Sequence, residues 1–344
     1  MKPVDRTTST KIANASVFGM MMIVGIHVLG HGWQSLEKGS PFWWFVAFGQ
    51  YGIFSVAVPF FFTCSGYFLA GHMDEEGWWI RECGKRMKSL LTPYLLWCVI
   101  SALLSAGLDM RASGFRPLFY SSVSFWVDTF GFSPFRHPSL GPLWFVRALM
   151  LFVVASPVVY WCVRRTGFLI LFVLYVMAGL THPMGRFWKE GSLFFTYCFN
   201  LSGFFFFCLG IFGRVKNIAL PNRGYVLALI VGLCLVFSGA YCNLQGIKLN
   251  IPQSGLVIPI LLFGFWGVVP EARLPKWLTG TTFAIFLLHI PLYKILAAIS
   301  PMRVDNVLEW IVKWIVGWGG SLVIAIVICR SAPHMAKALF GGRM

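Results

Sequence analysis

The sequence predicts an all-α integral membrane protein with about ten transmembrane helices and both termini in the cytoplasm. Of its 344 residues, 58% are hydrophobic and only 12% are charged, which is about half the charged fraction of an average soluble domain. Many apolar runs approach the roughly 20 residues that a helix needs to cross the hydrocarbon core of a bilayer. No Pro/Ser-rich linker and no block of charge divides the chain, so we expect one membrane domain over residues 1–344 and no separate soluble domain.

The apolar runs follow one another along the whole chain. The second is long enough to be tilted, bent or partly interfacial, whereas the fifth and the eighth are short. The first is not expected to be a secretory signal, because it lacks a small-residue cleavage site and its apolar stretch is long. The runs occupy residues 12–30, 42–70, 90–108, 143–162, 167–182, 193–213, 224–242, 254–270, 277–300 and 310–330.

The distribution of Lys and Arg orients these spans. With both termini inside, the inner segments hold 17 of these residues, the outer segments hold eight, and the spans hold three, which accounts for all 28. Because Lys and Arg accumulate in cytoplasmic loops, this bias predicts cytoplasmic termini. The formal net charge of +16 has the same explanation, so we expect membrane lipids around the protein and no nucleic-acid partner.

Few ionisable side chains lie within the apolar runs, and no Asp or Glu is among them. Such groups are costly in a bilayer, so each is a candidate functional residue. The two lysines can extend to the headgroups, and Arg147 is as consistent with binding an anion as with a structural role. The set comprises His27, His31, Arg147, His289, Lys294 and Lys313.

His27 is the leading candidate for a general base. It is 15 residues into the first run, or about 22 Å along a helix, and imidazole exchanges protons readily near neutral pH. The alternative is a buried histidine bonded to a neighbouring helix. His31 follows at i+4 and would share its face. With His289 the pair could supply three metal ligands, but no carboxylate or Cys accompanies them, so we expect no metal.

Signatures of soluble enzymes are absent. The chain has no G-x-S-x-G turn, no G-x-x-x-x-G-K-[ST] phosphate loop and no H-E-x-x-H zinc motif. These absences argue against the hydrolase, nucleotide-binding and metalloprotease classes that such motifs indicate.

Four segments in order together resemble the membrane-integral acyltransferase 3 family. Members of that family move acetyl or other acyl groups onto sugars of surface polysaccharides, lipopolysaccharide and antibiotics. The resemblance implies an O-acyltransferase that modifies a glycan and lies in the bacterial inner (plasma) membrane. The segments are VPFFFTCSGYFLAG at 58–71, KRMKSLLTPYLLW at 85–97, LGPLWFVRALM at 140–150 and FAIFLLHIPL at 283–292.

The first helix of the family carries Arg, ten further residues and then His. Here His27 fits the His position, and Ser16 stands where the Arg is expected. Eleven positions correspond to about 1,100° of helix, so the two residues share a face about three turns apart. Lys11 lies on roughly the opposite face and cannot replace the Arg. Arg86 matches the first of two arginines that follow the second helix in the family.

The resemblance implies acyl-CoA, with acetyl as the expected acyl group, as a co-substrate rather than a bound cofactor. Arg81, Lys85, Arg86 and Lys88 would bind its phosphates, although such a cluster can also set topology or contact lipid headgroups. His27 would then deprotonate a hydroxyl of the glycan acceptor. His289 is expected to support the site through a backbone carbonyl near Pro291. The acceptor or its channel would be lined by His31, Arg147, Trp144, Ser65, Tyr67, His289 and Ser16.

Two other functions remain open at this stage. A transporter or flippase of a glycan or acyl compound would usually show paired charges or broken helices at the midplane, and the chain offers only Pro59, Pro157, Pro259 and Pro291. A catalytically inactive member of the family is the other alternative, and Ser16 is its only motivation.

Overall fold

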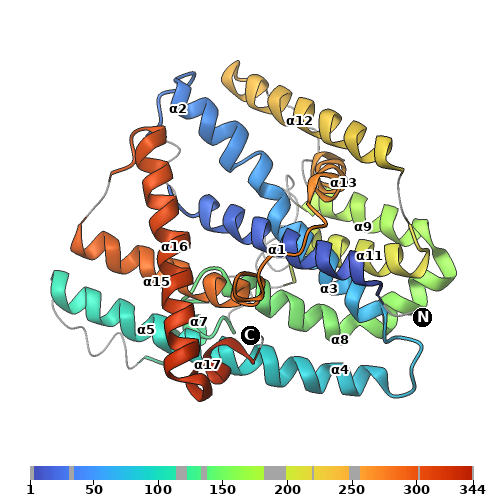
Figure 1. Ribbon diagram of the computed structural model, residues 1–344, viewed down its shortest axis with the longest axis horizontal. Helices are drawn as coiled ribbons and strands as arrows, with labels where there is room; N and C mark the ends of the chain where they lie inside the picture. The colour runs from blue at the N-terminus through green and yellow to red at the C-terminus, as the bar shows by residue number, and fades with distance from the viewer. Residues whose placement is uncertain are drawn as a thin grey trace.

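A computed structural model describes residues 4–30, 35–113, 122–132, 138–181, 199–218, 221–247, 256–300 and 303–342. All regular structure in these ranges is helical (Figure 1). The α-helices are α1 (Arg6–Ile26), α2 (Pro41–Trp44), α3 (Ala57–Ala70), α4 (Trp78–Arg86), α5 (Thr92–Ser113), α7 (Val123–Thr129), α8 (Leu143–Thr166), α9 (Phe168–Thr181), α11 (Leu201–Val215), α12 (Asn222–Leu244), α13 (Ile258–Val268), α14 (Lys276–Thr279), α15 (Thr282–Ile299), α16 (Val307–Ser331) and α17 (Pro333–Phe340). Two π-helices, η2 (Phe45–Gln50) and η4 (Met87–Leu91), and one 3-10 helix, η3 (Ile53–Val56), join some of them.

The helices confirm a multi-pass membrane protein. Within the described ranges, seven helical stretches are long and apolar enough to cross a bilayer. Three shorter apolar helices, at Phe168–Met177, Leu201–Val215 and Ile258–Val268, fall on the fifth, sixth and eighth predicted runs. The total of ten spans and the cytoplasmic termini stay predictions.

Helix α1 lies at the centre of the bundle. It contacts α3, α15 and α16, and it crosses the middle of Figure 1. Helix α12 lies at the upper edge of the same view and packs mainly on α13. Half of the apolar window of α1 is buried by protein, compared with 11% of that of α12. The side chains of α1 are therefore available to form an internal site, whereas most of α12 is left to face lipid.

The second predicted run is bent, as expected from its length. It consists of α2, η2, η3 and α3, and the chain turns at Gly52 between the two irregular helices. A Cβ atom on Gly52 would lie 2.3 Å from the carbonyl oxygen of Phe48 and 2.3 Å from a methyl of Val236. Only glycine fits at this turn, which sets the direction in which α3 enters the core.

Helix α3 packs most extensively against α11. Gly66 lies against the carbonyl oxygen of Phe207, and Gly210 lies against that of Thr63. Small residues allow two backbones to approach closely in a membrane bundle. This close contact fixes the face of α3 that carries Ser65.

The segment from α4 through η4 to α5 forms one helical stretch of 33 residues, Trp78–Met110. It runs along the lower edge of Figure 1. Its first part lies beside α8, where the indole nitrogen of Trp79 donates to the carbonyl of Val154 (3.2 Å). Helix α17 folds back on it, and the indole of Trp97 donates to the carbonyl of Leu339 (3.0 Å). These contacts hold the junction of α4 and η4 inside the bundle.

Candidate functional site

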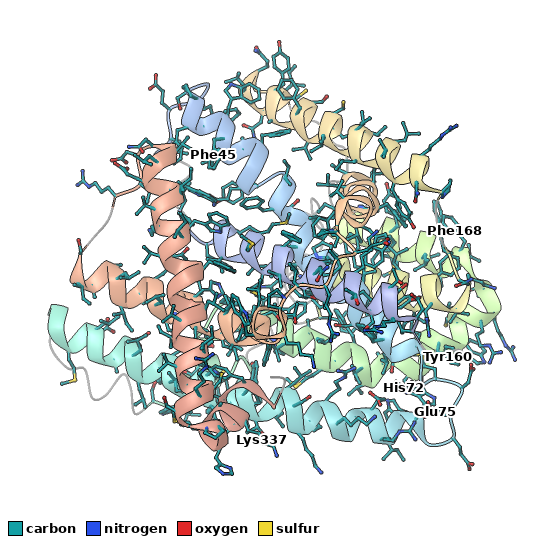
Figure 2. The ribbon with its side chains drawn as sticks, viewed as in Figure 1. Phe45, His72, Glu75, Tyr160, Phe168 and Lys337 are labelled. Atoms are coloured by element: carbon teal, nitrogen blue, oxygen red, sulfur yellow. The ribbon has the colours of Figure 1, made fainter. Side chains whose placement is uncertain are left out.

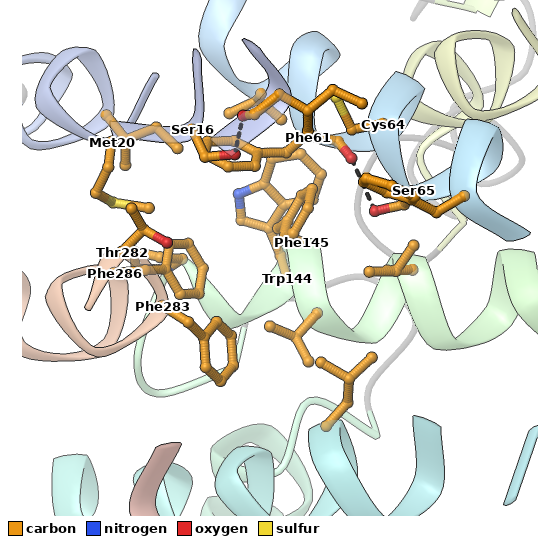
Figure 3. A pocket seen from close by; sticks show the side chains of 18 of the residues that line it. Ser16, Met20, Phe61, Cys64, Ser65, Trp144, Phe145, Thr282, Phe283 and Phe286 are labelled. Carbon is orange, nitrogen blue, oxygen red and sulfur yellow. Dashed lines mark hydrogen bonds between the residues drawn. The ribbon is translucent and has the colours of Figure 1, made fainter. Parts of the chain in front are cut away.

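A cavity of about 410 Å³ lies where α1, α3, the α4–η4 junction and the first turns of α8 and α15 meet. We call it the His27 cavity. Figure 3 shows aromatic side chains from three helices around it, with Phe61 on α3, Phe145 on α8, and Phe283 and Phe286 on α15. Its polar side chains include His27, Ser16, Ser65, Arg86, Trp144 and Thr282.

One face of α1 forms a wall of the cavity. Ile12, Ser16, Met20, Ile23 and His27 all line it, at the spacing of three and four residues that places side chains on one face of a helix. Ser16 and His27 therefore share a face, as the eleven-residue spacing predicted. The hydroxyl of Ser16 donates to the carbonyl of Ile12 (2.8 Å).

Lys11 points elsewhere, also as predicted. Its ammonium lies 3.6 Å from a carboxylate oxygen of Glu271 and 5.1 Å from the ring centre of Trp266. It is not among the residues that line the cavity, so no lysine of α1 takes the place of the missing arginine.

The position of His27 differs from the expectation. Sequence analysis placed it deep within a helix, but α1 ends at Ile26 and His27 is the capping residue, with φ −91° and ψ 0°. The physical reason lies in a later segment: the amide of Gln50 donates to the carbonyl of Ile26 (2.9 Å), and the hydroxyl of Tyr51 donates to that of Gly30 (3.0 Å). Carbonyls that a longer helix would use are satisfied from outside it.

His31 lies outside the described residues. Its i, i+4 pairing with His27 stays a prediction. Among the described residues, no group of three His, Cys, Asp or Glu side chains could hold a metal ion.

His289 lies directly against His27. Their ring centroids are 5.2 Å apart and their planes are inclined by 41°. His289 is completely buried, and its Nδ1 lies 3.1 Å from the carbonyl oxygen of Ile285, one turn earlier in α15. A histidine of α15 thus packs behind the histidine of the cavity wall.

Arg86 is the cation that the structure brings to the cavity. It ends α4, where Leu90 follows one turn later on the same wall. Its Nη2 lies 3.8 Å from a carboxylate oxygen of Glu82, and its Nε is buried with no hydrogen-bond partner among the described residues. Glu82 is itself only 3% exposed. Sequence analysis missed this carboxylate because it precedes the apolar run at 90–108, whereas the helix begins twelve residues before that run.

The other three members of the predicted basic cluster do not line the cavity. Arg81 pairs with Glu75, Lys85 donates to Glu82 (2.6 Å), and Lys88 is exposed. Side chains one, two and five positions from Arg86 are rotated from it by about 100°, 200° and 140° on an α-helix. Helical geometry therefore allows a single cation of the four to face inward.

The paired charges gather at the turn between α3 and α4. Figure 2 shows His72 and Glu75 near Tyr160 of α8 at this end of the molecule. The hydrogen bond from His72 Nδ1 (3.1 Å), together with Arg81, lowers the pKa of the Glu75 carboxyl below its ordinary value. The hydroxyl of Tyr160 donates to Asp74, which also lies 3.7 Å from Arg164. This network ties the turn to the end of α8.

The two predicted site residues of α3, Ser65 and Tyr67, contact different parts of the molecule. Ser65 lines the cavity, with its hydroxyl bonded to the carbonyl of Phe61 (2.8 Å). Tyr67 is directed to α11, where its hydroxyl accepts from Arg214 (3.0 Å) and its ring packs on the guanidinium. Of Ser65 and Tyr67, only Ser65 lines the cavity.

The two predicted site residues of α8, Trp144 and Arg147, also contact different parts of the molecule. Trp144 lines the cavity, and Figure 3 shows its indole nitrogen on the side toward Ser16. Arg147 does not line it. Arg147 is buried and donates to the carbonyl of Gly131, a residue with φ +64° that precedes α8. This contact favours the structural interpretation of Arg147 over a role in binding an anion.

Comparison with known proteins fits this geometry. A family model described as an acyltransferase domain, the acyltransferase 3 family, matches residues 17–330. The chain belongs to this acyltransferase family. The resemblance found in the sequence is thereby confirmed, and the matched range includes His27, Arg86 and His289.

A relative with a named role is also similar to the chain. The succinoglycan biosynthesis protein ExoH of Rhizobium meliloti (strain 1021) is 28% identical over 200 residues, which make up 55% of this chain and 52% of that protein. The chain thus spans about half the length of this curated relative. No solved structure matches the chain.

The arrangement offers a definite set of chemical capabilities. His27 supplies a nitrogen that can exchange a proton, and Arg86 supplies a cation for an anionic group. Aromatic and aliphatic side chains from α3, α8 and α15 line the space between them. An imidazole and a guanidinium on the walls of one cavity suit a reaction between a hydroxyl and an anionic donor.

Proposed function

We propose that the protein transfers an acyl group, acetyl in the first instance, from acyl-CoA to a hydroxyl of a cell-surface or lipid-linked glycan. The observation that carries this proposal is that His27 and Arg86 line one cavity. Membership of the acyltransferase family supplies the reaction class. The relative named for succinoglycan biosynthesis supports a polysaccharide as the acceptor.

The phosphates of the proposed donor suit Arg86, the cation in the cavity wall. Coenzyme A carries phosphates at one end and the thioester at the end of a long uncharged arm. The buried Nε of Arg86 has no partner among the described residues, and Glu82 contacts the guanidinium only at 3.8 Å. Buried donors in proteins are normally satisfied, and a phosphate oxygen would make a charge-assisted hydrogen bond here. The cavity would then enclose the arm and the thioester.

The chemistry requires one base. A bare nitrogen of His27 takes the proton of the acceptor hydroxyl while the hydroxyl oxygen attacks the thioester carbonyl carbon. A new C–O bond forms, the C–S bond breaks, and the imidazolium returns its proton to the leaving sulfur. The products are an ester and free CoA, so no further reactant is needed.

Membrane placement makes this transfer useful to a bacterial cell. If the termini are cytoplasmic, the donor enters from the cytoplasm at the Arg86 side of the cavity. The end of α1 that carries His27 is then directed to the outer face, where the glycan is presented. The acyl group crosses the inner membrane by this route, whereas CoA stays inside.

Labelled acyl-CoA tests the proposal. Inside-out membrane vesicles that contain the protein and hold a glycan acceptor in their lumen would receive [14C]acetyl-CoA from outside, and vesicles from cells that lack the protein would be the control. We expect label in the glycan fraction only with the protein present. Label that accumulates in the vesicles as unchanged acetyl-CoA would contradict the proposal and indicate a transporter.

A further inference from the structure

Two histidines that are far apart in the sequence form one buried pair. His27 ends α1, His289 lies in the middle of α15, and their ring centroids are 5.2 Å apart. His27 also lines the cavity, whereas His289 does not. The second histidine therefore contacts the proposed base from behind rather than the substrates.

The tautomer of His289 follows from its one hydrogen bond. Its Nδ1 lies 3.1 Å from the carbonyl oxygen of Ile285, and a carbonyl oxygen can only accept, so Nδ1 carries the proton. A neutral imidazole has a single N–H, which leaves a lone pair on Nε2. That atom is buried and has no partner among the described residues. A buried acceptor of this kind requires a donor.

Of the described aromatic rings that pack against His289, that of His27 offers the donor. Phe286 packs against its ring at 6.2 Å between centroids and offers no donor. Tyr293 stands perpendicular to it at 6.5 Å, and its hydroxyl is directed to the carbonyls of Val24 (3.5 Å) and Lys313 (3.4 Å). Two imidazole rings whose centroids are 5.2 Å apart can bring one nitrogen of each to the usual hydrogen-bond distance of about 2.9 Å.

The backbone next to His27 is held from a distant segment. The amide of Gln50 donates to the carbonyl of Ile26, and the indole of Trp310 donates to Gln50 (2.7 Å). Gln50 and Trp310 are 1% and 2% exposed, so this pair is a fixed internal support.

We propose that His289 is a positioning residue for His27. Its Nε2 accepts the N–H of His27 that points away from the cavity, which leaves the other His27 nitrogen bare toward the substrates. When His27 takes the acceptor proton, the same bond stabilises the imidazolium, since both of its nitrogens then carry protons. This role rests on the proposed function, because it presumes that His27 is the base.

Variants of His289 test the role by separating positioning from folding. Leu fills the site without an acceptor, whereas the side-chain oxygen of Gln can accept the N–H of His27. We expect His289→Leu to lower kcat at least about tenfold, within the range that general-base catalysis contributes, with the KM for acyl-CoA within twofold of wild type. His289→Gln should restore at least a third of kcat. Tyr293→Phe is the control at the same depth and should keep wild-type kinetics. Full activity in His289→Leu, or equal losses in the Leu and Gln variants, would overturn the proposal.

A measurement on the unmodified protein covers the case in which His289→Leu does not fold. With ¹⁵N-labelled histidine, an N–H···N bond gives a scalar coupling between the nitrogens of the two rings, and His27→Gln identifies the His27 signal by its loss. We expect this coupling, together with a protonated Nδ1 on His289. Its absence would overturn the pairing even if acyl transfer is observed. Its presence in a protein without transferase activity would instead refute the proposed function.

Discussion

Replacing Gly210 by Ala adds one methyl group at the closest contact between two helices. The added Cβ would lie 1.9 Å from the carbonyl oxygen of Thr63 and 2.8 Å from the backbone nitrogen of Tyr67, both on α3. These are backbone atoms that no side-chain rotation can move. The two helices would have to separate by about an ångström, because real Cβ contacts essentially never fall below 3.0 Å.

The energetic effect can be estimated against a control on the same helix. Overpacking a tight interior costs about 1–3 kcal/mol. Gly213 lies one turn further along α11 and has nothing within 4 Å of an added Cβ. Gly213→Ala should be neutral or stabilising by about 0.5–1 kcal/mol, because Ala is the better helix former. The two variants should therefore differ by roughly 1–4 kcal/mol, or on the order of 1–6 °C in apparent Tm for a chain of this length.

Thermal unfolding in detergent measures this difference directly. We expect Gly210→Ala to unfold well below wild type and Gly213→Ala at or above it. Because α3 also carries Cys64, Ser65 and Phe68 of the cavity wall, folded Gly210→Ala should lose most of its acyl transfer. Equal unfolding temperatures for the two variants would refute the close packing of α3 on α11.

Three further predictions concern the site and the topology. Arg86→Gln should raise the KM for acyl-CoA about tenfold or more, because a charge-assisted hydrogen bond is worth about 1.5–3 kcal/mol; Lys88→Gln is the control, and equal KM values would reduce Arg86 to a topology signal. Ser16→Arg would place a cation about three turns from His27 on the same face, so it should preserve or raise the transfer rate, and a tenfold loss at normal protein abundance would contradict this. A reporter active only in the cytoplasm and fused after residue 344 should be active, whereas an inactive fusion that is expressed would overturn the cytoplasmic C-terminus.

Hydropathy and helical geometry were enough to predict the parts of the fold that depend on local sequence. The apolar runs mark the membrane helices, and the length of the second run indicates its bend. The eleven-residue spacing places Ser16 and His27 on one face, which the cavity confirms. Each of these features can be inferred from the apolar length or the 3.6-residue period of a single helix.

The parts that the sequence did not predict depend on contacts between distant segments. The end of α1 before His27 depends on Gln50, which lies in a different helical segment. His289 reaches His27 only after α15 packs on α1. Glu82 was missed because a charged turn of helix extends the third span beyond its apolar run. A single sequence carries no local signal for the first two contacts, whereas the i, i+4 spacing of Glu82 and Arg86 offered a signal for the third.

We propose that His27 is the base in a cavity that also binds acyl-CoA. The most direct test compares wild type and His27→Ala for acyl transfer and, in the same preparations, for acyl-CoA binding. We expect transfer to fall at least about 10²-fold, as for loss of a general base, while binding of acyl-CoA at the Arg86 wall is kept. Wild-type transfer by His27→Ala would contradict this role of His27.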